Sequence, residues 1–153
     1  IQSPQNAFYL NLGLESLHVR VPQHCKNARA VAEFLSTSDK VASVRYPDLP
    51  GDPYHKLAEK YLPNGSCGVV SFEVAGGREA AERFMAGLRV FAIETHVADA
   101  RSCCLHPASS THRQMTNDEL VAAGISPAMV RMSCGIEGTD DLVADVEQAL
   151  ARV

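Results

Sequence analysis

The feature that most constrains this fold is the alternation of helical and strand-like segments along the chain. Apolar side chains recur every three or four residues over 4–36, which predicts two helices or one bent helix. Pro22 interrupts this stretch and has no N–H to donate, so we expect the helix to kink or split there. Shorter strand-like runs follow at 41–46, 68–74, 90–93 and 130–134. None is the long apolar strand of a parallel sheet, so the pattern predicts an α+β fold, with a small, mostly antiparallel sheet and helices packed on one face.

Two polar clusters predict further helices in the second half of the chain. Thr116 and Glu119 have the spacing of a capping box, and Thr139, followed by two aspartates, is expected to cap the last helix. Residues 94–115 have no clean period and are rich in His, Ser and Cys. An irregular stretch of this length inside a compact domain is often functional, so we look there first for a site.

The charge and the cysteine content argue against several classes of function. The chain has 153 residues, the size of one domain, and carries 14 basic against 18 acidic side chains. Its net charge of -4 argues against a nucleic-acid partner and against an anionic membrane surface. No apolar run is long enough to span a bilayer. The five scattered cysteines do not suggest a disulfide framework, so we predict a cytoplasmic protein.

A metal site is the first chemical possibility in the irregular stretch. Its candidate ligands would be Cys103, Cys104, His106 and His112. Thiolates and imidazoles bind zinc, but this spacing is not a known zinc arrangement. The two cysteines are adjacent, so they point in opposite directions if the segment is extended. We therefore predict no metal site and interpret these residues as small thiols and locally hydrogen-bonded imidazoles.

Nucleophilic catalysis has even less support in the residues themselves. A thiolate at Cys67 or Cys134 would need a base such as His96, and no local signature accompanies either cysteine. Neither a phosphate-binding glycine loop nor a lysine in an apolar setting is present. The loop 95–102 is dense in donors and acceptors, but it is equally typical of a polar surface loop. We predict no catalytic residue in this chain.

Arg131 is the remaining candidate, because it lies inside a predicted strand. It alternates with Val130 and Met132, so its side chain should leave the face that they bury. A guanidinium matches a carboxylate or a phosphate with two parallel hydrogen bonds. On residue chemistry alone, a solvated surface arginine is the simpler interpretation.

Motifs from end to end of the chain suggest a family. They are Ser3–Phe8, Leu12–Leu17, Tyr46–Pro47 with Pro53–His55, Asp99–Ser102, His106–Ser109, Thr111–His112 and Val130–Glu137. In this order and spacing the whole chain resembles the C-terminal domain of the pyridoxal-phosphate (PLP) enzymes of Cys/Met metabolism. Within that family, the Asn6-Ala7-Phe8 opening and the 106–112 stretch look most like the O-acetylhomoserine sulfhydrylases.

The resemblance implies a γ-replacement that makes homocysteine from O-acetylhomoserine and sulfide. It implies PLP in the full-length enzyme, bound to a lysine of an absent N-terminal domain, and no PLP on this chain alone. The partners it implies are an amino-acid substrate, that absent domain and copies of the same subunit, usually in a tetramer. The alternatives are a cystathionine γ-synthase, a methionine or cystathionine γ-lyase of the same family, or a free-standing, non-catalytic α+β interaction module.

The resemblance also implies domain limits and binding residues. Residues 1–36 would be a helix that leads from the absent large domain, and 37–153 would form the small C-terminal domain. Arg131 matches the family's arginine for the substrate α-carboxylate. His96 and Val97 lie in the loop that lines the same carboxylate site, where the family often has a small polar residue followed by an aliphatic one. The bulk of His96 departs from that pattern.

Overall fold

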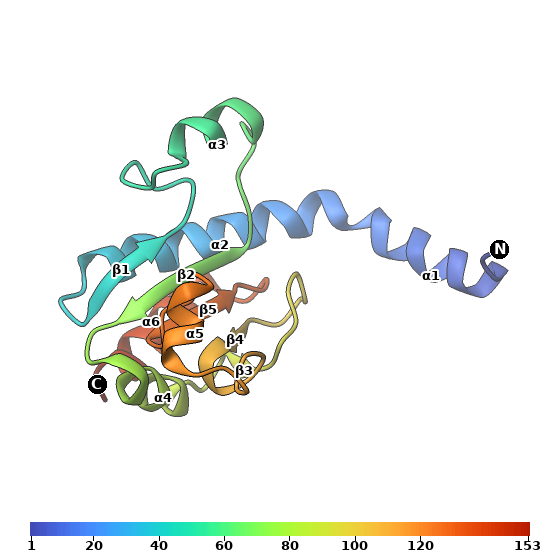
Figure 1. Cartoon of the computed structure of the whole chain (residues 1–153). Coiled ribbons are helices and arrows are strands. Elements are labelled where there is room, and N and C mark those ends of the chain that lie inside the picture. Colours follow the sequence, from blue (N-terminus) through green and yellow to red (C-terminus); the bar gives the residue numbers. More distant parts are fainter.

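A five-stranded sheet organises the computed structural model, which describes residues 1–153 (Figure 1). Its strand order is β1-β2-β5-β4-β3. The strands are β1 (Val41–Arg45), β2 (Val69–Val74), β3 (Ala92–Ile93), β4 (Cys103–Leu105) and β5 (Met129–Ser133). Only β3 and β4 pair in parallel, and every other neighbouring pair is antiparallel.

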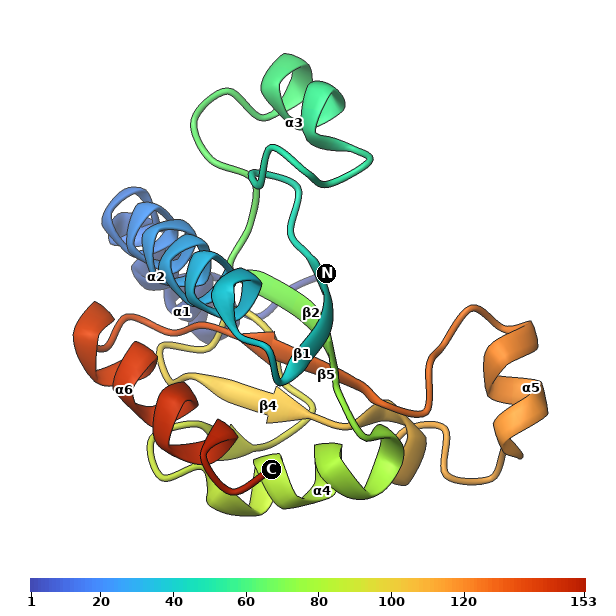
Figure 2. The same cartoon turned by 90° about the vertical axis from the view of Figure 1, so that its left-hand side faces the viewer.

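Three helices cover one face of this sheet, namely α2 (Leu17–Thr37), α4 (Gly77–Gly87) and α6 (Thr139–Leu150). Figure 2 shows them together on one side of the sheet, with α5 (Asn117–Ala122) on the other side of the molecule. The helix α3 (His55–Tyr61) stands away from the body on an arm, and a 3-10 turn, η1 (Pro107–Ser109), follows β4. The predicted fold class is therefore confirmed.

Strict alternation along the central strands decides which side chains the helices bury. Val70, Phe72 and Val74 of β2 are buried in the core, as are Val130 and Met132 of β5. The register pairs Phe72 with Val130 across the two strands, so the buried sets coincide. Phe72 also meets Phe84 of α4 edge to face, with ring centroids 5.3 Å apart. The intervening residues necessarily project from the opposite, open face.

The first helical stretch forms two helices, as one of the two predicted arrangements has it, but they divide at Ser16, so the predicted split at Pro22 is wrong. α1 (Pro4–Glu15) ends one residue before Ser16, and α2 continues through Pro22. Arg20 bridges the junction, since its guanidinium donates to the Gly13 carbonyl at 2.6 Å and to the Ser16 hydroxyl at 3.1 Å. These contacts satisfy a terminal carbonyl of α1 and explain why the break is stable at Ser16.

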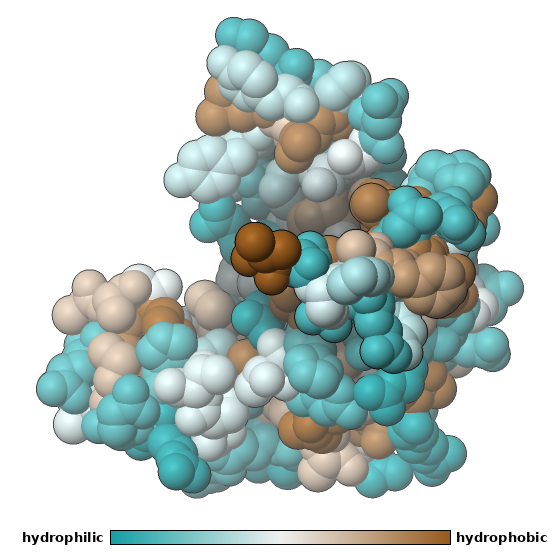
Figure 3. Space-filling model, turned by 90° about the vertical axis from the view of Figure 1, so that its right-hand side faces the viewer, coloured by the Kyte–Doolittle hydropathy of each residue, from teal (hydrophilic) through white to brown (hydrophobic).

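The first helix, α1, has no buried residue and extends away from the domain. Phe8, Tyr9 and Leu10 are each about three-fifths exposed (61%, 59% and 59%). Because successive residues point 100° apart around a helix, these apolar side chains are exposed on different sides of α1. In Figure 3, which faces this end, brown apolar atoms lie among teal ones. No helix of the chain has the length and apolar character needed to cross a bilayer.

Two further details differ from the sequence expectations. β4 lies inside the stretch that has no clean period, because a three-residue strand is too short to show one. The last helix begins after Gly138, and the Thr139 hydroxyl donates to Asn27 at 2.7 Å instead of capping the helix. The capping box of Thr116 and Glu119 is present as predicted.

Candidate functional site

Arg131 lies at the centre of the open face of the sheet. Its cross-strand neighbours are Ser71 on β2 and Leu105 on β4. Val130 and Met132, on either side of it, are fully buried among the helices, whereas Arg131 is half-buried. The guanidinium is therefore outside the hydrophobic core, on the face that α2, α4 and α6 do not cover. Its neighbours on this face, Leu105 and Ser133, are themselves buried, at 4% and 3% exposed.

The charge of Arg131 is not neutralised within the chain. One of its Nη atoms donates to the Thr95 carbonyl at 2.9 Å. None of the ion pairs in the structure includes this guanidinium. A guanidinium has five N–H donors, so most of them stay free for an anion. This arrangement suits a planar carboxylate better than a neutral ligand.

The loop 94–101 lies beside Arg131 and is attached to β5. Its Ala98 N–H donates to the Ser133 hydroxyl oxygen at 3.1 Å, and Ala98 has a positive φ of 59°. Only a few per cent of residues other than glycine adopt this left-handed conformation, so it marks a constrained turn. The Thr95 carbonyl and the Ser133 hydroxyl are the two polar groups that sequence reasoning missed. Ser133 shares its face with Arg131, so strand alternation was the signal that could have identified it.

The two predicted loop residues are both exposed. His96 has a side chain that is 64% exposed, with Nδ1 3.1 Å from an oxygen of Glu94 and 3.9 Å from one of Asp99. Val97 is 53% exposed. A hydrogen bond of 2.9 Å from the Arg101 N–H lowers the pKa of the Asp99 carboxyl. The structure thus places His96 and Val97 in the loop whose Thr95 carbonyl meets Arg131, and their contact with a substrate stays a prediction.

The four residues considered as metal ligands do not converge. Cys104 lies in the core and pairs with Met132, whereas Cys103 pairs with Ser133 on the open face. His106 uses both ring nitrogens, against the Ser109 hydroxyl and the Pro127 carbonyl, each at 2.8 Å. His112 contacts the hydroxyl of Thr111 at 2.9 Å. No group of three or more potential ligands is found anywhere in the structure.

The two cysteines considered as nucleophiles are poorly placed for that role. Cys134 is fully buried, and burial raises the pKa of its thiol to about 12. Cys67 directs its sulfur to the Val69 carbonyl at 3.3 Å. His96 instead has Glu94 as its nearest charged partner. A neutral, buried thiol is a weak nucleophile, so the geometry supports the interpretation of Cys134 as a core residue.

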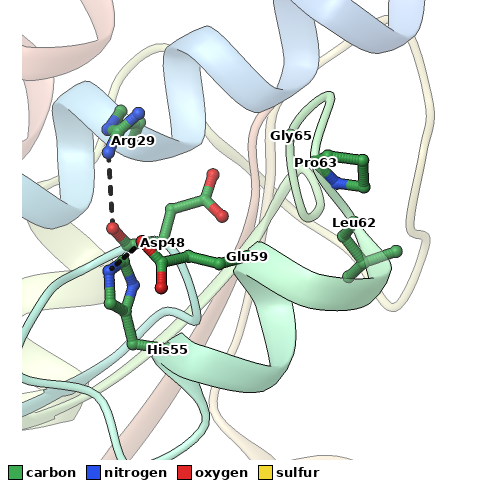
Figure 4. Close-up of a pocket in the computed structure, with 7 residues that line it drawn as sticks. All are labelled: Arg29, Asp48, His55, Glu59, Leu62, Pro63 and Gly65. Atoms are coloured by element: carbon green, nitrogen blue, oxygen red, sulfur yellow. Dashed lines mark hydrogen bonds and ion pairs between the residues drawn. The ribbon is translucent and has the colours of Figure 1, made fainter.

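A polar pocket between α2 and the α3 arm is the other feature of the surface (Figure 4). It is lined by Arg29, Asp48, His55, Glu59, Leu62, Pro63 and Gly65. Arg29 forms an ion pair with Glu33 at 3.3 Å, and His55 lies 3.6 Å from Glu59. The Asp48 carboxylate accepts from the Tyr46 hydroxyl and the Ser66 N–H, each at 3.4 Å. The charged groups that line this pocket therefore have partners within the chain, whereas Arg131 has no anionic partner.

Comparison with known proteins decides the family. A family model described as Cys/Met metabolism PLP-dependent enzyme matches residues 1–151. The chain belongs to this family. The family predicted from the sequence motifs is thus confirmed, and PLP is the cofactor of the family.

Individual relatives carry more than one activity in their names. The chain is 42% identical over 152 residues to an O-acetyl-L-homoserine sulfhydrylase of Leptospira meyeri, covering 99% of the chain and 34% of that protein. It is 41% identical over 150 residues to an L-methionine gamma-lyase of Pseudomonas putida, covering 98% of the chain and 37% of that protein. The chain spans about a third of the length of these relatives.

A solved structure agrees with the fold. It is described as an O-acetylhomoserine (thiol)-lyase of Campylobacter jejuni with N'-pyridoxyl-lysine-5'-monophosphate. Its TM-score to this chain is 0.89 at 42% identity, covering 97% of this chain and 35% of that one.

The open face of this chain fits a carboxylate but not the cofactor itself. PLP enzymes hold the cofactor on a lysine, and no lysine lies on β2, β4, β5 or the 94–101 loop. The four lysines are Lys26 on α2, Lys40 before β1, and Lys56 and Lys60 on α3. Lys40 donates its ammonium hydrogens to the carbonyls of Leu150 and Val153 at 3.0 and 3.1 Å. Around Arg131 there is thus a guanidinium that suits a carboxylate, and no amine that could hold the PLP aldehyde.

Proposed function

We propose that this chain is the part of a PLP-dependent enzyme that binds the carboxylate of the amino-acid substrate. The reaction we propose for the complete enzyme is the replacement of acetate by sulfide on O-acetylhomoserine, which produces homocysteine. The observation that carries this proposal is the unpaired guanidinium of Arg131 on the open face. The Leptospira meyeri sulfhydrylase, at 42% identity, supports the choice of reaction.

The geometry around Arg131 suits a substrate α-carboxylate. The Thr95 carbonyl holds one Nη atom of the guanidinium, which leaves the other N–H groups for two parallel hydrogen bonds. The Ser133 hydroxyl oxygen accepts from Ala98, and Ser133 is only 3% exposed, so this residue fixes the loop beside Arg131. A carboxylate bound here would be fixed in orientation as well as position, because a bidentate pair has one plane.

The exposed helix α1 supports the second part of the proposal, a partner polypeptide. A helix that is apolar on all sides is normally surrounded by protein. We propose that α1 packs against the PLP-binding portion that the longer relatives have, and that the complete enzyme is a homo-oligomer. In Figure 1, α1 and the loop 94–101 lie toward the same side, so one partner can contact both. The cytoplasmic location stays a prediction.

The test is a substitution of Arg131 in the complete enzyme. Arg131→Ala removes the charge-assisted hydrogen bonds to the carboxylate, so we expect KM for O-acetylhomoserine to rise about 100-fold. Arg83→Ala is the matched control, because Arg83 is an exposed arginine on α4, on the helical face. It should leave KM unchanged. An unchanged KM in Arg131→Ala would remove Arg131 from the site.

A methionine γ-lyase is the second candidate, favoured by the Pseudomonas putida relative at 41% identity. The two activities differ in their need for sulfide. Homocysteine formed from O-acetylhomoserine only when sulfide is added supports the sulfhydrylase. Release of a thiol from methionine without added sulfide supports the lyase instead. Both reactions use an amino-acid carboxylate, so the role of Arg131 is the same in either.

A further inference from the structure

A set of polar contacts joins the segment after β5 to the C-terminal end of the loop 94–101 and to Ser102, which follows it. These contacts do not involve Arg131. After β5, the chain runs alongside the segment that enters β4, and the Ile136 N–H donates to the Ala100 carbonyl at 2.9 Å. Two side chains, Ser102 and Glu137, lock these segments together. Neither of them hydrogen-bonds to Arg131, so they are separate from the guanidinium contacts described above.

Ser102 is fully buried, and the Glu137 carboxylate accepts hydrogen bonds from both its N–H and its hydroxyl. The Ser102 N–H donates to one carboxylate oxygen at 2.6 Å, and the Ser102 hydroxyl donates to the other at 2.8 Å. The same hydroxyl accepts from the Gly135 N–H at 2.7 Å. Bonds to an ionised carboxylate are stronger than bonds between neutral groups. Glu137 is therefore the main anchor of the C-terminal end of the loop.

The backbone around this anchor has little freedom to move. A Cβ atom at Gly135 would overlap the Ala100 carbonyl oxygen and the Glu137 carboxylate. From α2, the Asn27 amide donates to the carbonyls of Gly135 and Glu137, each at 2.9 Å. The segment that carries Glu137 is thus held from the loop side and from the helix side. A rigid support of this kind is what an accurately placed binding loop requires.

We infer that Glu137 is a positioning residue for the carboxylate site. It holds the loop 94–101 so that the Thr95 carbonyl accepts from Arg131. This contact orients the guanidinium, so that its remaining N–H groups face the substrate. Without the carboxylate, the buried N–H and hydroxyl of Ser102 lose their acceptor. Apart from the Arg131 contact itself, the loop then keeps only the bonds from Ala98 to Ser133 and from Ile136 to Ala100 on the side of β5, so the Thr95 carbonyl is held less firmly against Arg131. The inference rests on the proposed function of Arg131, but it assigns a role to a residue that contacts no substrate.

The experiment compares Glu137→Ala and Glu137→Gln with Asp145→Asn. Asp145 is the matched control, because its buried carboxylate also accepts backbone N–H groups, those of Arg89, Val90 and Phe91, in a different loop. In the complete enzyme, Glu137→Ala should raise KM for the amino-acid substrate about tenfold and leave kcat within about twofold. Glu137→Gln keeps one acceptor oxygen, so its effect on KM should be smaller. Asp145→Asn should lower stability without raising KM.

Hydrogen exchange of this chain by itself provides a readout that is independent of activity. The Ala98 amide, which donates to the Ser133 hydroxyl, should exchange about tenfold faster in Glu137→Ala and at the original rate in Asp145→Asn. If Glu137→Ala does not fold, Ser102→Ala is the second variant. It removes both bonds of the hydroxyl, to Glu137 and from Gly135, but keeps the bond from the Ser102 N–H to Glu137, and it should accelerate exchange of the Ala98 amide. If KM and the exchange of the loop amide in the Glu137 variants equal those of the wild type, while Arg131→Ala raises KM, the inference is overturned. If Arg131→Ala leaves KM unchanged, the proposed function itself fails.

Discussion

Asn27 joins the first long helix to the segment that follows β5, so its removal should cost measurable stability. The side chain is fully buried on α2. Its amide nitrogen donates to the carbonyls of Gly135 and Glu137, and its amide oxygen accepts from the Thr139 hydroxyl and from the Gln23 amide. The first three of these partners lie more than 100 residues away along the chain, so those contacts exist only in the folded protein.

The size of the effect of Asn27→Ala can be estimated from these bonds. A protein hydrogen bond contributes about 1 kcal/mol net, so four lost bonds predict a decrease of about 4 kcal/mol in the free energy of unfolding. For a domain of this size, such a decrease lowers Tm by about 8–16 °C. The assay is urea denaturation of this chain followed by far-UV circular dichroism, with the slope m compared to confirm a similar unfolded state.

The control for this prediction is Glu33→Ala on the same helix. Glu33 pairs with Arg29 at 3.3 Å, and both side chains are more than half exposed. An exposed pair of this kind contributes at most about 0.5 kcal/mol. If Asn27→Ala lowers the free energy of unfolding no more than Glu33→Ala does, Asn27 does not hold the 135–139 segment. Glu137 would then be supported by its contacts with the loop and not by α2.

Two further predictions concern pH. Burial raises the pKa of the Cys134 thiol to about 12. Iodoacetamide at about pH 8 should therefore not label Cys134 in the folded chain and should label it in urea. Equal labelling in both states would place this thiol at the surface. Hydrogen bonds from the Thr116 N–H and hydroxyl lower the pKa of the Glu119 carboxyl in the folded chain. The capping box therefore stabilises α5 fully above the pKa that Glu119 has in the unfolded chain, about 4.3. This stabilisation is lost as the pH falls through the lower pKa that Glu119 has in the folded chain. The protection factor of the α5 amides, which is the intrinsic exchange rate divided by the measured one, should therefore fall as the pH is lowered to about 2. Glu119→Gln removes the titrating carboxyl and should abolish that dependence. A protection factor insensitive to pH in the unmodified chain would contradict the prediction.

Local patterns in the chain were sufficient for most of the secondary structure. Alternation in 130–134 placed Val130 and Met132 on one face and Arg131 on the other, as the structure has them. The capping box at Thr116 was equally readable, because it involves residues three apart. Where the evidence was short or indirect, prediction failed. β4 has only three residues, and the break between α1 and α2 depends on an arginine that reaches back to Gly13.

The candidate site was only half visible in the same way. Arg131 was identifiable because a charged residue inside a strand is unusual, and the family motifs assigned it a carboxylate. Strand alternation was the only signal for the Ser133 hydroxyl, and the contacts of the Thr95 carbonyl and of Glu137 had no local signal. Their functions arise from contacts between residues that are 35 or 36 positions apart.

The amino-acid sequence by itself determined the family, the α+β class and the face of the strand from which Arg131 projects, because each depends on motifs or on the period of a single segment. Only the tertiary structure decided that this guanidinium has no anionic partner, that a loop carbonyl orients it, and that α1 is left with apolar side chains exposed on all sides. Those properties depend on which distant segments lie together, and no local pattern of residues encodes them.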